Sequence, residues 1–157
     1  MKYISYYKSP LGNILLASDG KYLTGLWFET QKYYAKNLDE NALEKDLEIF
    51  VLTKKWLDLY FKGLNPDFNI PVKFYGTNFQ KCVWQRLLDI PYGYTTTYSE
   101  LASRLHTSAR AIGTTIGKNP ISIIVPCHRV VGKKNNLTGY AGGVEKKEYL
   151  LKLESSK

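Results

Sequence analysis

The stretch IIVPCHRVVG, residues 123–132, places Cys127 directly beside His128 at the end of an apolar run. These two residue types together are typical of a nucleophile and the base that activates it. Neighbouring side chains in extended backbone point to opposite faces, so adjacency alone does not explain how the imidazole would reach the thiol. Because Pro126 removes a backbone donor, we expect a strand to end there, with the thiol at its mouth.

The residues around Cys127 favour a reactive thiol. Groups that stabilise a thiolate follow it in the sequence: His128, Arg129, Lys133 and Lys134. Cys82 lies in a helical pattern without neighbouring charge, so we expect an inert, core-facing thiol there. Two cysteines are too few for a disulfide framework and lack the C-x-x-C spacing of zinc sites. The pattern predicts one functional cysteine, no metal, and a reducing, cytoplasmic setting.

Two other functions use parts of the same pattern. A cysteine hydrolase would need the same Cys-His pair, together with an oxyanion hole and a route by which water releases an acyl-enzyme. A DNA sensor or regulator would need no thiol at all. The presence of the thiol and its histidine therefore favours an enzyme over a binding module.

The first half of the chain predicts a small sheet covered by a helix. The turn signals SPLGN and SDGK separate β-favouring stretches, so strands are expected near 2–7, 13–18 and 21–28 as an antiparallel meander. Apolar residues recur at helical spacing from Asn41 to Lys62, and Gly63 followed by Asn-Pro ends that run. NPDFNIPVKFYG is typical of an extended linker. We therefore expect two domains, 1–73 and 74–157.

The second half predicts helices. A helix begins at Thr77 or Asn78, Ser99 is expected to cap the helix ELASRLH, and TSARAIGTTIG forms another short helix after a tight turn. Helix, turn and small-residue helix together resemble a helix-turn-helix. Small side chains surround one long one, Arg110, which suits a backbone-following contact in the minor groove rather than base reading in the major groove.

Charge and hydropathy narrow the class of protein further. The formal net charge is +8; residues 1–73 carry ten Lys/Arg against nine Asp/Glu, and residues 74–157 carry twelve against five. The second half therefore supplies nearly all the attraction for a polyanion such as DNA. No run of 18 apolar residues and no secretory leader is present in the sequence, so no membrane association is expected.

Four segments carry a family resemblance. IPYGYTTTYSELA, ARAIGTTIGKNP, IIVPCHRVVG and GYAGGVEKKEYLLKLE, in this order and spacing, resemble the O6-alkylguanine-DNA alkyltransferases over roughly Phe74 to Glu154. The resemblance implies an α+β fold, with a ribonuclease-H-like N-terminal sheet and helix and a mostly helical C-terminal domain with a winged-helix-like helix-turn-helix. It also implies transfer of an alkyl group from O6 of guanine in double-stranded DNA to Cys127, once per molecule, by a monomer without a cofactor.

The resemblance assigns roles residue by residue. The thiolate attacks the alkyl carbon of a base flipped out of the stack; a water relays the thiol proton to His128, Glu154 orients the imidazole, Tyr98 assists the departing purine, and Asn119 braces the turn before the cysteine. The implied catalytic residues are Cys127, His128, Glu154, Tyr98 and Asn119. The implied DNA-binding residues are Arg110, Ala109, Ala111, Gly113 and Thr107. The implied pocket residues are Tyr98, Ile116, Val130, Tyr140 and Ala141.

The sequence departs from the family pattern in two places. Ala141 stands where many relatives have serine, which leaves only a backbone N–H near the substrate oxygen. Thr114, Thr115 and Ile116 replace a more usual Gly-Ala-Met run, which changes the breadth of the expected pocket.

Overall fold

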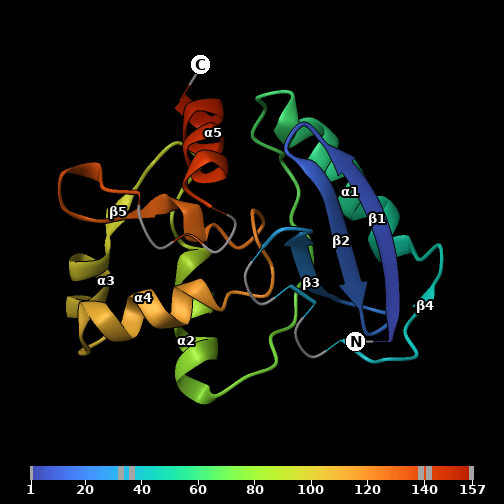
Figure 1. Ribbon diagram of the computed structural model, residues 1–157, viewed down its shortest axis with the longest axis horizontal. Helices are drawn as coiled ribbons and strands as arrows, with labels where there is room; N and C mark the ends of the chain where they lie inside the picture. Colours follow the sequence, from blue (N-terminus) through green and yellow to red (C-terminus); the bar gives the residue numbers. More distant parts are fainter. Residues whose placement is uncertain (1, 32–33, 36–37, 138–139, 141–142, 156–157) are drawn as a thin grey trace.

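The computed structural model describes residues 2–31, 34–35, 38–137, 140 and 143–155, and shows a mixed α+β molecule (Figure 1). The strands of the first half are β1 (Tyr3–Ser9), β2 (Gly12–Ser18), β3 (Leu23–Phe28) and β4 (Leu43–Glu44). They form one sheet in the order β3-β2-β1-β4, with β1, β2 and β3 antiparallel. The expected meander is therefore confirmed, and α1 (Glu48–Phe61) packs on it.

The start of α1 differs from the sequence prediction. Instead of continuing the helix back to Asn41, residues 43–44 pair with β1 as a short parallel strand. The backbone N–H of Leu43 donates to Lys2 at 2.9 Å, and that of Lys45 donates to Ile4 at 3.2 Å. Leu47 then has extended backbone at the N-cap. Hydrogen bonds to the open edge of β1 replace the first helical turns here, so periodicity alone placed the start too early.

Two segments from outside the sheet close the outer edge of β3. The linker runs along it, because Leu23 donates to Pro71 at 2.9 Å and Lys73 donates to Leu23 at 3.0 Å. Further along the same strand, Leu26 donates to Pro120 at 2.8 Å and accepts from Ser122 at 3.0 Å. The extended linker is confirmed, and the segment just before the Cys-His pair also adds to the N-terminal sheet.

The second half is built mainly of helices. They are α2 (Asn78–Leu87), α3 (Tyr98–Arg104), α4 (Ala109–Gly117) and α5 (Val144–Ser155), with two short 3-10 turns, η1 (Cys127–Arg129) and η2 (Lys133–Asn135). Strands β5 (Thr96–Thr97) and β6 (Val130–Val131) form a small parallel sheet. A capping box between Thr77 and Gln80 starts α2, as expected. The cap of α3 is Thr97, whose hydroxyl accepts from Glu100, so the prediction of Ser99 was wrong.

The segment before Cys127 is a turn and not the strand that the apolar run predicted. Only Ile121 makes a strand-like bridge, to Leu26, and residues 122–124 form turns. Ile123 has φ +69°, in the left-handed region that β-branched residues rarely adopt, although its side chain is buried. Burial of successive apolar side chains in a tight turn gives the same sequence pattern as a buried strand.

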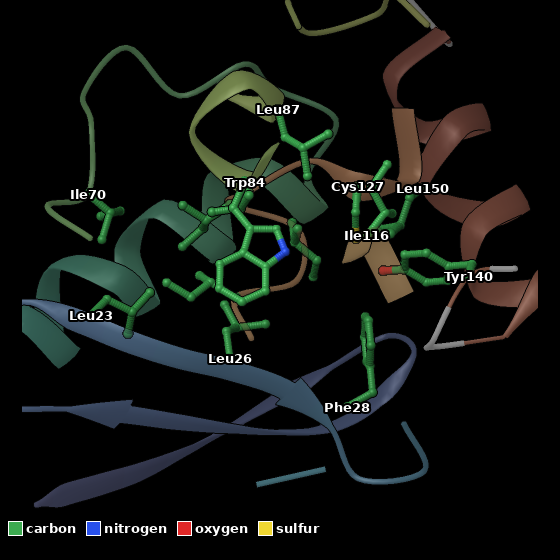
Figure 2. Close-up of a cluster of buried hydrophobic side chains, with 14 of the residues drawn as sticks. Leu23, Leu26, Phe28, Ile70, Trp84, Leu87, Ile116, Cys127, Tyr140 and Leu150 are labelled. Atoms are coloured by element: carbon green, nitrogen blue, oxygen red, sulfur yellow. The ribbon is translucent and has the colours of Figure 1, made fainter. Parts of the chain in front are cut away.

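One hydrophobic cluster joins the two halves. It contains Leu23, Leu26 and Phe28 from β3, Trp84 from α2 and Cys127 itself (Figure 2). Cys82, by contrast, is exposed on α2, so the expectation of a core-facing thiol was wrong. The division at residue 73 stays a prediction, because the main cluster extends across it. Within the described residues, no helix is long and apolar enough to cross a membrane.

Candidate active site

The backbone around Cys127 answers how neighbouring residues can share one site. Residues 127–129 form a single 3-10 turn, so Cys127 and His128 do not project to opposite faces of a strand. Cys127 is 3% exposed and His128 is fully buried. Both side chains therefore lie inside the protein, shielded from bulk solvent.

Burial dominates the ionisation of the thiol. It raises the pKa of Cys127 to about 11, opposed by a hydrogen bond from the Asn119 side chain and by the positive charge of Lys147. The cations expected from the sequence act elsewhere: Lys133 and Lys134 are exposed, and Arg129 binds a carboxylate. Cys127 is thus a protonated thiol at neutral pH.

A buried network lies behind His128. The Nε2 atom of His128 is 2.6 Å from Oε2 of Glu154, on α5. Arg129 donates to the same carboxylate through Nε, 2.8 Å from Oε1, and through Nη2, 3.2 Å from Oε2. The hydroxyl of Tyr60, on α1, donates to Oε2 at 2.6 Å, and the backbone N–H of Gly93 donates to Oε1 at 3.2 Å. The implied pairing of His128 with Glu154 is therefore present in the structure.

This network fixes the protonation state of the histidine. Donors on His128 and Arg129 outweigh burial and lower the pKa of Glu154 to about 2, so the carboxylate is ionised. Burial lowers the pKa of His128 despite the carboxylate beside it, so the imidazole is neutral at pH 7. A neutral ring that donates from Nε2 has a lone pair on Nδ1. Nδ1 is buried and makes no hydrogen bond to any described residue.

Lys147, on α5, is a buried cation that sequence reasoning missed. Its Nζ donates to the backbone oxygen of Val130 at 2.6 Å and to the Tyr98 hydroxyl at 3.5 Å, and lies 5.6 Å from the Tyr98 ring centroid. Burial lowers the pKa of Lys147 to about 8, while the Cys127 thiolate would raise it. The only sequence signal was a basic pair in GGVEKKEYL, which also fits a solvated helix face.

Asn119 holds the turn that precedes the cysteine. Its Nδ2 donates to the backbone oxygens of Ile121 at 3.3 Å and Val125 at 2.9 Å, and its Oδ1 accepts from the N–H of Ile121 at 3.0 Å. The side chain is 2% exposed. These contacts agree with the bracing role implied by the resemblance.

The implied pocket residues gather around the thiol. Ile116, Val130 and Tyr140 belong to the same buried cluster as Cys127, and Figure 2 shows the Tyr140 hydroxyl pointing toward Cys127 and Ile116. That hydroxyl is buried and has no hydrogen-bond partner among the residues that the structure describes. Tyr98 is half-buried next to Lys147. Ala141 lies outside the described residues.

The implied DNA-binding residues lie on or beside α4. Ser108 caps the helix by accepting from Ala111, and Ile112, Thr115 and Ile116 bury its inner face. The outward positions are small except for one: Ala109 and Arg110 are exposed, and Ala111, Gly113 and Thr107 are partly exposed. Of the three departing residues on this helix, Thr114 is exposed, whereas Thr115 and Ile116 are buried. The carbonyl of Thr115 accepts from Trp84.

The remaining observations concern metal ligands and two residues of the network. Within the described chain, no group of His, Cys, Asp and Glu side chains could hold a metal ion. Sequence reasoning missed Tyr60, because nothing in the helical pattern of α1 separates this tyrosine from the other core positions. It also gave Arg129 no partner, whereas the structure pairs it with Glu154.

Known proteins match this chain over nearly its whole length. Residues 78–156 match the family described as 6-O-methylguanine DNA methyltransferase, DNA binding domain, and residues 2–74 match its ribonuclease-like domain. A methylated-DNA–protein-cysteine methyltransferase from Haemophilus influenzae is 44% identical over 97% of this chain and 86% of its own. The counterpart from Methanosarcina mazei is 44% identical over 98% of each chain.

A solved structure agrees with the sequence comparisons. The crystal structure of Mycobacterium tuberculosis OGT in complex with DNA superposes with a TM-score of 0.87 at 40% identity, covering 98% of this chain and 93% of that one. Family, fold class and activity implied by the four sequence segments are thereby confirmed. This chain belongs to the 6-O-methylguanine DNA methyltransferase family.

Proposed function

We propose that this protein repairs O6-alkylguanine in double-stranded DNA by moving the alkyl group onto its own Cys127. The observation that carries the assignment to this residue is the buried pair of Cys127 and His128. Glu154 holds Nε2 of the imidazole at 2.6 Å, and Nδ1 has no partner among the residues that the structure describes. Such an arrangement accepts one proton at Nδ1 and stabilises the resulting imidazolium.

The proposed chemical step is an in-line displacement. The thiol proton passes through one water to Nδ1 of His128, and the sulfur attacks the alkyl carbon. The S–C bond forms as the C–O6 bond breaks, and the electron pair leaves with the purine. The purine takes one proton from solvent, which balances the thiol proton held by His128, and becomes guanine. Burial raises the pKa of Tyr98, so its hydroxyl stays protonated and can donate to the departing base. The ammonium of Lys147 donates to that hydroxyl at 3.5 Å.

Proton transfer during attack explains why a thiol with a raised pKa is useful here. A buried thiolate would need a permanent partner, whereas a neutral thiol and a neutral imidazole carry little desolvation cost until substrate arrives. Once charge develops on sulfur, the ammonium of Lys147 stabilises it. The ionised pair exists only while the substrate is bound.

DNA binding is assigned to the outward face of α4. Its small residues allow the helix to approach the sugar-phosphate backbone in the minor groove, and Arg110 is the one long side chain on that face able to fill the space of an extruded nucleotide. Because the thiol is 3% exposed, the base reaches it only when covering side chains such as Tyr140 move. The protein is proposed to act as a monomer without a cofactor.

The product is an alkylated, inactive protein. An acyl-enzyme is a thioester that water can attack, but an alkylated cysteine is a thioether whose carbon has only a poor leaving group. Cys82, exposed on α2, is not among the groups of the site. Mixing the protein with excess duplex containing O6-methylguanine should give a burst of repaired DNA whose amount equals the amount of active protein. The added mass should lie on the peptide that contains Cys127. Product formation that continues linearly would favour a hydrolase.

A further inference from the structure

Tyr60 brings the N-terminal region into the network behind the reactive thiol. It lies on α1, yet its hydroxyl donates to Oε2 of Glu154 at 2.6 Å and is 3.4 Å from Nε2 of His128. The side chain is fully buried. The residues that it contacts are 94 and 68 positions further along the chain.

Packing fixes where this hydroxyl points. The Tyr60 ring stacks on Trp56 with centroids 5.3 Å apart and meets the edges of Phe61 and Tyr92 at 5.5 and 6.1 Å. A ring held on several sides cannot turn its hydroxyl away without disturbing these contacts. The hydrogen bond to Glu154 is therefore a built feature of the interface between the two halves.

Glu154 receives several donors, and they are not equivalent. Arg129 and the N–H of Gly93 bind Oε1, while Oε2 accepts from His128 and Tyr60 at the same distance of 2.6 Å, with a longer contact from Arg129. Hydrogen bonds to one oxygen compete for its negative charge. The phenol thus limits how strongly the carboxylate can stabilise an imidazolium.

We propose that Tyr60 is a positioning residue for the alkyl transfer: its hydroxyl orients the Glu154 carboxylate and sets how much of its charge His128 receives. This inference rests on the function proposed above. It means that a residue outside the second half of the chain sets the strength of the base that takes the thiol proton.

The sign of the effect follows from the contacts. Burial and the nearby carboxylate raise the pKa of Tyr60 far above its ordinary value, so the phenol is always a donor. Removing the hydroxyl leaves Oε2 with more charge for His128, which stabilises the imidazolium and raises the His128 pKa. Replacing Glu154 by glutamine removes that charge and has the opposite effect.

A test of Tyr60 must leave the other charged and titratable groups near His128 unchanged. Arg129 acts on His128 from η1, Lys147 and Glu154 from α5 and Tyr60 from α1. Cys127 is its neighbour in the chain, Tyr92 lies near Glu154, and Tyr140 lies near Cys127. Tyr60→Phe leaves every formal charge in this set unchanged and keeps the ring. A shift in the His128 titration can then be attributed to the hydroxyl.

Nitrogen-15 NMR of the imidazoles tests the proposal without any alkyl transfer. The chain has two histidines, and exposed His106 provides a reference signal. The wild type should show His128 as the Nε2–H tautomer. Tyr60→Phe should keep that tautomer and move the titration midpoint of His128 upward by roughly half a unit to one unit. The matched control is Tyr7→Phe, which removes a 2.7 Å hydrogen bond to Asp58 on the same helix and should leave His128 unchanged.

Two further variants test the direction of the His128 shift and whether the effect of Tyr60 passes through Glu154. Site-specific 3-fluorotyrosine at position 60, a stronger donor, should move the His128 midpoint downward, and it preserves the fold if Tyr60→Phe does not. In a Glu154→Gln background, Tyr60→Phe should produce no additional shift. An unchanged His128 titration in Tyr60→Phe, or a full shift that persists without the carboxylate, would overturn the positioning role.

The proposed function is tested separately by benzyl transfer from free O6-benzylguanine to the wild-type protein, measured by mass spectrometry. Failure of that transfer would contradict the function and leave the NMR result to decide on the network. If transfer occurs, the acid limb of its rate-versus-pH profile should move to higher pH in Tyr60→Phe, because His128 must be neutral to accept the thiol proton. The profile should stay in place in Tyr7→Phe. A profile unchanged in both variants would mean that Tyr60 serves stability alone.

Discussion

The outward face of α4 and the network behind Cys127 solve different physical problems. The α4 face is exposed, made of small side chains, and contains one cation, Arg110, able to reach outward. The network is buried, and each charge in it has a designated partner, as Arg129 has Glu154. One region depends on close approach to another molecule, and the other on internal contacts between residues far apart in the sequence. Substitutions in the two regions should therefore fail in different ways.

The largest expected effect comes from the thiol itself. Cys127→Ser should abolish alkyl transfer and leave DNA binding nearly unchanged, because a serine hydroxyl is far less ionised and less nucleophilic than a thiol. Transfer is measured by mass spectrometry, and binding by a fluorescence titration with duplex DNA. Cys82→Ser, on the exposed side of α2, is the control and should retain full transfer. Transfer retained by Cys127→Ser would remove this residue from the reaction.

Acid should destabilise the protein through Glu154. A carboxyl whose folded pKa lies below its unfolded value contributes stability above that unfolded value and loses it as pH falls. Since the pKa of Glu154 is lowered from 4.5 to about 2, its contribution should be complete above pH 4.5 and vanish near pH 2. The contribution is at most on the order of 3 kcal/mol.

Urea unfolding at several pH values measures this contribution. Glu154→Gln should be less stable than the wild type at pH 6, and the two should converge toward pH 2. Glu100→Gln provides a control, because that carboxylate forms an exposed ion pair with Arg104 on α3. A wild-type stability that stays level between pH 4.5 and 2 would show that the network does not hold the ionised carboxylate.

Arg110→Ala should affect the other region. It is expected to slow repair of O6-methylguanine in duplex DNA by roughly thirtyfold, because extrusion of a base costs a few kcal/mol that the arginine offsets. Reaction with free O6-benzylguanine should be unchanged. Lys55→Ala, which removes an exposed cation from α1, controls for the loss of charge. Equal slowing on both substrates would assign Arg110 to structure.

The smallest expected effect distinguishes an electrostatic role of Lys147 in the buried region from a packing role. Lys147→Met should slow benzyl transfer at pH 7 by about tenfold, since the ammonium stabilises charge on the sulfur of Cys127. The same change should not lower the unfolding midpoint in urea, because burial already disfavours the charged lysine and methionine fills a similar volume. A variant that loses stability in proportion to activity would make Lys147 a packing residue instead.

The sequence was informative where interactions are local. Caps, turns and periodicity predicted three of the strands, the end of α1 shortly before Gly63 and the N-cap of α2 at Thr77, because each depends on neighbours a few residues away. They failed at Leu43, which pairs with β1, and at residues 121–126, where a buried turn has the composition of a strand. The site residues came mostly from the family resemblance. Tyr60 and Lys147 were missed because their roles arise only from contacts across the fold.

The pairing of β3 with residues 120–122 affects how the molecule avoids association. An unpaired sheet edge presents N–H and C=O groups to any other chain, and native proteins usually cover it. Here Pro71 and Lys73 cover Leu23, and the segment leading to the reactive cysteine covers Leu26. The turn that positions the thiol therefore also blocks one edge of the sheet, so a change that frees residues 120–122 would expose a template for intermolecular β pairing as well as disturb the chemistry.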